Sequence, residues 1–135
     1  MFGLTMLKHK RVLKLAFSDC LKPVKDGLGN VPLGMHTSKL ITASILGICR
    51  AYEQTQQLSK ADFDLLVDAV FEDIFRRESV KVQLLTESWL QQADSDFLAY
   101  YYKAKANANN DPDLSWLQYL ALENFQQAET VVFPL

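Results

Sequence analysis

The chain has 135 residues, of which 49% are hydrophobic and 22% are charged, and it contains two cysteines. This length fits one domain, 1–135, and the composition excludes a disordered chain, a collagen-like fibre and a disulfide scaffold. The net charge is −2, yet residues 1–26 carry six bases against two acids, so a basic segment precedes an acidic remainder.

The basic N-terminal segment, 1–26, is predicted to form a helix over about residues 5–21. Pro23 ends this helix because proline restricts the residue before it and donates no backbone hydrogen bond. The buried stripe consists of Leu13, Phe17, Cys20 and Leu21, at helical spacing. The candidates for binding an anion or nucleic acid are Lys8, Lys10, Arg11 and Lys14. We expect them to lie on the acidic part of the same molecule, because four net charges are few beside a nucleic-acid footprint.

A loop rich in glycine and proline, 25–36, follows the first helix. It is longer than the usual connection of about 4–6 residues, and long loops often have a function. The loop is therefore the best candidate for a functional segment. Its Gly-x-Gly pattern follows no strand and lacks the Lys-Ser/Thr ending of a phosphate-binding loop.

The next predicted helix, about residues 38–57, begins at a cap formed by Thr37 or Ser38. Apolar residues surround its first half, which predicts a buried helix at the centre of the fold. A row of small residues spaced by four, Ala43, Gly47 and Ala51, allows another helix to approach closely.

The third predicted helix, 60–78, begins after a cap at Ser59 and carries a row of acids. The row consists of Asp64, Asp68 and Glu72, at i, i+4 and i+8. We interpret it as a solvated face. An alternative is a Mg²⁺ or Ca²⁺ site, or a metal-dependent hydrolase that also uses His36 of the loop.

The remaining chain is predicted to form a helix over 79–92, with Val82, Leu85, Trp89 and Ala93 inward. A shorter helical segment follows from Phe97 and fades into a turn-rich stretch, 103–111. A last helix, capped by Asp111 and with Pro112 at its first position, continues to about residue 128. No pair of alternating runs forms a hairpin. The sequence therefore predicts an all-α bundle of five or six helices.

Surplus aromatic residues and an apolar C-terminal tail, 130–135, are the main indications of an interaction surface. Three consecutive tyrosines on a helix cannot all face one core, because successive residues are about 100° apart. The candidate interaction residues are Tyr100, Tyr101, Tyr102, Trp116, Phe133 and Leu135. The tail either folds back over the bundle or docks in a groove of a partner.

The sequence shows no catalytic set, no cofactor motif and no metal-ligand spacing of its cysteines, Cys20 and Cys49, and histidines, His9 and His36. It also lacks a secretory signal and a membrane span, so we expect a cytoplasmic protein. The leading hypothesis is a small non-catalytic interaction or regulatory protein that binds a protein partner or forms a homodimer. The alternatives are the acid-using pocket protein or hydrolase and the basic anion-binding module.

Overall fold

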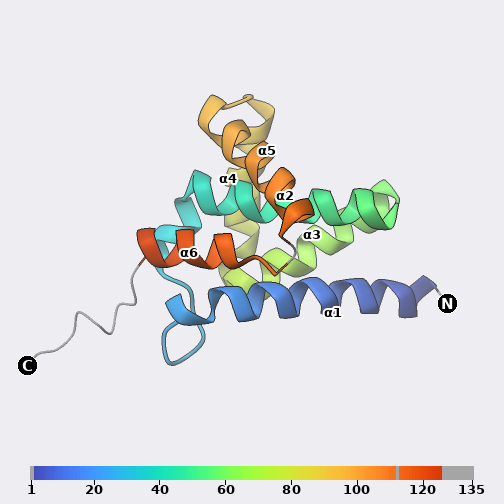
Figure 1. Ribbon diagram of the computed structural model, residues 1–135, viewed down its shortest axis with the longest axis horizontal. Helices are drawn as coiled ribbons and strands as arrows, with labels where there is room; N and C mark the ends of the chain where they lie inside the picture. The colour runs from blue at the N-terminus through green and yellow to red at the C-terminus, as the bar shows by residue number, and fades with distance from the viewer. Residues whose placement is uncertain (1, 112, 126–135) are drawn as a thin grey trace, which may run out of the picture.

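The computed structural model describes residues 2–111 and 113–125 and is all-α, which confirms the predicted fold class (Figure 1). Among these residues, three short 3-10 helices are η1 (Lys22–Val24), η2 (Leu33–Thr37) and η3 (Arg76–Glu78). The α-helices are α1 (Phe2–Leu21), α2 (Lys39–Gln56), α3 (Lys60–Phe75), α4 (Ser79–Gln91), α5 (Ser95–Asn110) and α6 (Ser115–Asn124). In the described part of the chain, no helix has the length and hydropathy to span a bilayer.

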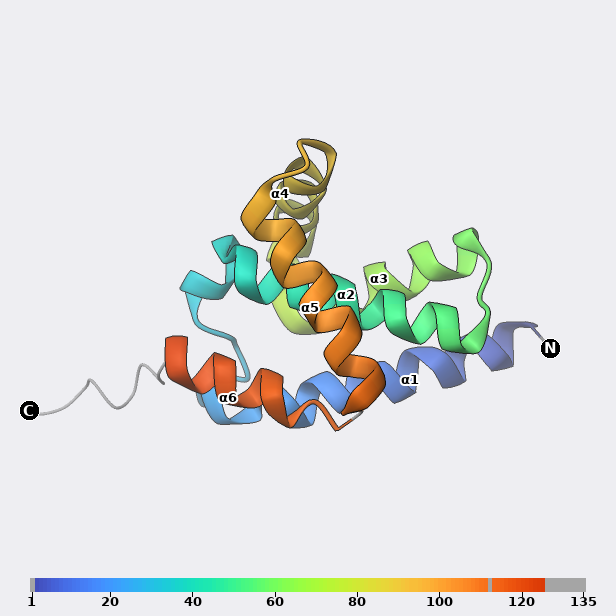
Figure 2. The same ribbon diagram turned by 45° about the horizontal axis from the view of Figure 1, so that its top comes forward.

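Helix α2 is the central element, as predicted. Every residue from 41 to 49 is buried, and α3, α4 and α5 all contact the helix (Figure 2). Ser38 forms the N-cap, with its hydroxyl accepting a hydrogen bond from the amide of Ile41 at 3.1 Å. The polar C-terminal end projects into solvent and closes with Gln57 in the left-handed conformation.

Helix α5 crosses α2 at the predicted row of small residues. A Cβ built on Gly47 would lie 2.5 Å from the carbonyl oxygen of Tyr101 and 3.1 Å from the Cβ of Ala104. Ordinary carbon contacts are about 3.5–4.0 Å, so only glycine admits the α5 backbone at this distance. The small-residue row therefore fixes how closely the two helices pack.

Helix α1 runs along one edge of the molecule and packs against α3 and α6 (Figure 1). Its inner face contributes the predicted stripe to the core, including the fully buried Phe17 and Leu21. One hydrophobic cluster joins buried side chains from all six α-helices. The cap of α3 is also confirmed, because the Ser59 hydroxyl accepts from the amide of Asp62 at 3.1 Å.

The prediction of a turn-rich stretch over 103–111 is wrong, because α5 continues through these residues to Asn110. Its alanines are strong helix formers, and Ala104 is buried where α5 meets Gly47. Packing against the central helix therefore outweighs the turn preference of the asparagines.

The predicted start of the last helix at Asp111 is also wrong. Asp111 is the C-cap of α5, and α6 begins at Ser115, whose amide donates to Asp113 Oδ1 at 3.0 Å. Pro112 and the predicted end of this helix near residue 128 lie outside the described residues.

Three smaller expectations also need correction. Helix α3 ends at Phe75 rather than 78, since Arg76 takes a positive φ of 57°. The predicted loop 25–36 ends earlier than expected, because the short 3-10 helix η2 begins at Leu33. Ala93 is exposed rather than part of the buried stripe, because α4 ends at Gln91.

Candidate functional site

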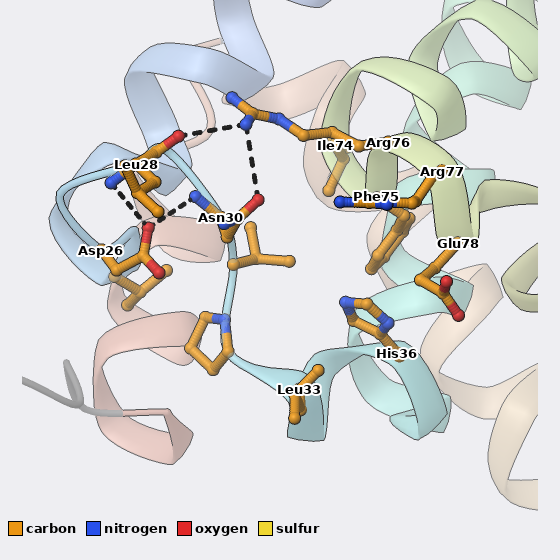
Figure 3. Close-up of a pocket in the computed structure, with 13 residues that line it drawn as sticks. Asp26, Leu28, Asn30, Leu33, His36, Ile74, Phe75, Arg76, Arg77 and Glu78 are labelled. Atoms are coloured by element: carbon orange, nitrogen blue, oxygen red, sulfur yellow. Dashed lines mark hydrogen bonds between the residues drawn. The ribbon is translucent and has the colours of Figure 1, made fainter.

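A pocket with a cavity of about 690 Å³ lies between the glycine-rich loop and the junction of α3 and η3 (Figure 3). Buried apolar side chains, including Ile74 and Phe75, form part of its lining. Leu28 and Leu33, which also line it, are 78% and 80% exposed. The pocket thus combines a buried apolar base with two leucines open to solvent.

The loop wall of this pocket is organised by Asp26. Its Oδ1 accepts hydrogen bonds from the amides of Leu28 and Asn30, both at 2.9 Å. Its own amide donates to the Asn30 carbonyl at 2.9 Å. The amide of Asn30, with lesser contributions from Leu28 and Arg76, lowers the pKa of the Asp26 carboxyl. These bonds give the exposed loop a defined shape without burial.

Arg76 connects the loop to the opposite wall (Figure 3). Its Nη1 donates to the Leu28 carbonyl at 3.0 Å and lies 3.4 Å from Asn30 Oδ1. Gly29 lies directly against the guanidinium, since a Cβ there would be 2.6 Å from Arg76 Nη2. The backbone of Arg76 has φ 57° and ψ −127°, a sparsely populated conformation that costs an L-residue about 1–3 kcal/mol. We call the Arg76 contacts with residues 28–30 the loop latch.

Three further polar side chains line the pocket: His36, Arg77 and Glu78. The His36 ring packs edge-on against Phe75, with the ring centroids 5.2 Å apart. Burial lowers the pKa of His36, and the Glu78 carboxylate partly opposes this. Arg77 is exposed, points into the pocket and forms no salt bridge with any described residue (Figure 3). Among the described residues, the pocket therefore presents Arg77 as a cation without a salt bridge, beside an apolar base.

The lining residues of the pocket combine apolar and charged side chains. Apolar surface at the base and rim favours an aliphatic or aromatic group, and Arg77 favours a carboxylate or another anion. The described residues that line the pocket include no hydroxyl or thiol side chain.

The predicted acidic row is divided between two surroundings. Asp64 pairs with Lys60 at 3.0 Å, and Asp68 accepts from Gln83 of α4 at 2.8 Å. Glu72 instead lines a polar crevice between α1 and α3, together with Lys14. Across residues 2–111 and 113–125, no group of three His, Cys, Asp or Glu side chains is arranged to hold a metal ion.

The predicted anion-binding bases lie along α1. Lys8 and Arg11 are exposed, whereas Lys10 and Lys14 are half-buried. Lys10, Arg11 and Lys14 line a shallow crevice that also includes Asp73 of α3. The basic helix thus lies partly beside the acids of α3, and its outer bases face solvent.

The aromatic candidates separate by exposure. Tyr101 is buried, and its hydroxyl accepts from Arg50 Nε at 3.2 Å, whereas Tyr102 is 59% exposed and Tyr100 is 36% exposed. Trp116 is half-buried, and its indole N–H is buried without an acceptor among the described residues. None of these four lines the pocket. Phe133 and Leu135 lie outside the described residues.

The cysteines and His9 occupy structural positions. Burial raises the pKa of Cys20 to about 12 and that of Cys49 to about 12, so both thiols stay protonated at neutral pH. The Sγ of Cys20 donates to the Leu114 carbonyl at 3.6 Å. His9 Nδ1 lies 2.6 Å from the Tyr52 hydroxyl.

The sequence indicated the loop wall of the pocket and His36, but not the opposite wall. The sequence predicts residues 76–78 as the last turn of the helix 60–78, with Arg76 placed to offset the charge of Glu72. One feature of the sequence could have indicated this second wall: the apolar pair Ile74 and Phe75 is followed directly by two arginines.

No protein-family model, curated protein or solved structure matches this chain.

Proposed function

We propose that this chain is a small non-catalytic interaction module. Its binding surface is the pocket between the glycine-rich loop and the end of α3, which we call the loop pocket. Its ligand is an extended apolar segment of a protein partner, and this segment also carries an acidic side chain. The observation that carries this proposal is the exposure of Leu28 and Leu33, 78% and 80%, at a cavity of about 690 Å³.

The apolar part of the pocket supports an extended peptide as ligand. Burying an exposed leucine contributes about 1.5–3 kcal/mol, so covering both leucines supplies much of the free energy of a micromolar complex. The latch already holds the loop against the junction of α3 and η3, which reduces the entropy lost on binding.

The polar part of the pocket supports an acidic side chain in the ligand. Arg77 is the cation without a described salt-bridge partner, whereas Arg76 is engaged by the loop and Glu78 pairs with Lys81 at 3.2 Å. An exposed pair with Arg77 contributes at most about 1 kcal/mol, so it selects the orientation of the ligand more than it sets the affinity.

A peptide with the sequence of residues 129–135, Glu-Thr-Val-Val-Phe-Pro-Leu, has the required chemistry and is the probe we would use. The fluorescently labelled peptide is titrated with the full chain and with a Phe133→Ser variant. This variant is used because its own segment 129–135 should compete less well with the added peptide. We expect binding in the micromolar range, at least as tight for Phe133→Ser as for the wild type.

Matched substitutions locate the binding. Leu28→Ser with Leu33→Ser is expected to weaken binding by at least about 100-fold, and Arg77→Gln up to about fivefold. Leu84→Ser is the control, because Leu84 is 62% exposed on α4 and does not line the pocket. Binding that survives the double leucine substitution, or that Leu84→Ser weakens equally, would overturn the proposal.

A further inference from the structure

The outward face of α1 combines exposed aliphatic and basic side chains. Leu7 and Leu15 are each 58% exposed and Val12 is 44% exposed. Leu7, Arg11 and Leu15 are spaced by four residues, and Lys8 and Val12 lie beside them on the same side of the helix. We call these five residues the α1 outer face. Helix α1 lies along an edge of the molecule (Figure 1), and helical spacing places these five residues on the side away from the buried Leu13, Phe17 and Leu21.

The two cations of this face form no salt bridge with a described residue, although Arg11 lines the same crevice as Asp73 of α3. None of the salt bridges formed within residues 2–111 and 113–125 involves Lys8 or Arg11. Each cation therefore remains available to an external anion.

We propose that the α1 outer face binds the surface of an anionic lipid bilayer. An interfacial helix lies parallel to the membrane, with leucines entering the boundary of the headgroups and lysine or arginine contacting the anionic lipids. Spacing by four places Leu7, Arg11 and Leu15 in one line along α1, so all can reach a flat surface together. Nucleic acid would contact the same bases through phosphates, but that contact gives no role to Leu7, Val12 and Leu15.

The test is co-sedimentation of the full chain with vesicles. One set contains phosphatidylcholine only, and the other contains equal parts of phosphatidylcholine and phosphatidylserine. We expect binding to the anionic vesicles only, weakened by added salt. Lys8→Ala with Arg11→Ala should reduce the partition coefficient about 30-fold, and Leu7→Ser with Leu15→Ser about tenfold or more.

Matched controls use equally exposed residues on other helices. Leu84→Ser, with Leu84 62% exposed on α4, and Lys60→Ala, with Lys60 exposed on α3, should leave vesicle binding unchanged. Equal binding to both vesicle types, no binding to either, or equal loss in the controls would overturn the proposal. Binding to a DNA oligonucleotide that needs Lys8 and Arg11 but not Leu7 and Leu15, without vesicle binding, would assign the face to nucleic acid instead.

Discussion

At Gly47 and at Gly29, another part of the molecule lies where a Cβ atom would be, and the two contacts differ in kind. At Gly47, the backbone of α5 meets the buried backbone of α2, with the Tyr101 carbonyl oxygen in the space that a Cβ would need. At Gly29, the exposed loop meets the side chain of Arg76. The first contact depends on packing and cannot adjust, because interiors are close-packed. The second depends on hydrogen bonds of a flexible side chain, which can move. The helix crossing in the core is therefore rigid, whereas the loop wall of the pocket can adjust.

The largest effect should come from Gly47→Val. The added side chain would meet the Tyr101 carbonyl oxygen at 2.5 Å, and separating two backbones should cost roughly 3 kcal/mol of unfolding free energy. Urea denaturation of Gly47→Val and of Gly27→Val measures the difference. Gly27 has no atom within 4 Å of the added Cβ, so its variant should change stability by less than about 0.5 kcal/mol. Equal losses in the two variants would contradict this account of the crossing.

Gly29→Ala should have a smaller effect that is confined to the loop. The φ of +84° costs alanine about 1 kcal/mol, while the Arg76 guanidinium can move away from the new Cβ. That movement breaks the hydrogen bond to the Leu28 carbonyl. We expect faster hydrogen exchange of the Leu28 and Asn30 amides, with core amides little changed. Unchanged exchange of these two amides would show that the latch does not hold the loop.

Paired substitutions at Arg76 separate its backbone strain from its side-chain contacts. Arg76→Ala and Arg76→Gly both remove the latch, but only glycine tolerates φ 57°. The glycine variant should therefore be more stable than the alanine variant by about 1 kcal/mol. At Arg77, which has no positive φ, the same pair should show the opposite order. The same order at both positions would argue against strain at Arg76.

The pH dependence of stability should be the smallest effect, and it concerns His36. Burial lowers the pKa of this histidine in the folded state, so the unfolded chain binds its proton more readily. Stability is therefore greatest above the unfolded pKa of about 6.5 and falls as the pH drops through the lowered value. Thermal melting at pH 7.5 and 5.5 should show this fall in the wild type, and a smaller fall in His36→Gln. An equal fall in both would assign the pH dependence to other groups.

The core was largely predictable from the sequence, because local signals agree with the tertiary structure there. The apolar circumference of α2 and its small-residue row predicted both its burial and the close approach of a neighbour. The row could not say which helix approaches. The helix that approaches is α5. The same contact explains why the prediction of turns over 103–111 is wrong: the asparagines favour turns locally, but packing of Ala104 against α2 keeps this segment helical.

The candidate site was predictable on one side only. Glycine and proline in 25–36 marked the loop, because their backbone preferences are local. The opposite wall depends on Arg76 taking a positive φ that arginine does not favour, and tertiary contacts with the loop accompany it. No local pattern around Arg76 and Arg77 indicates that conformation.

The most direct test of the proposed function maps where the probe peptide binds. Amide chemical shifts of the full chain would be followed by NMR as the peptide of residues 129–135 is added. We predict that the largest changes appear at Leu28, Leu33, His36 and Arg77, and disappear in the Leu28→Ser, Leu33→Ser chain. Changes centred on Tyr100 and Tyr102 or on α1, or no saturable changes at all, would contradict the loop pocket as the binding surface.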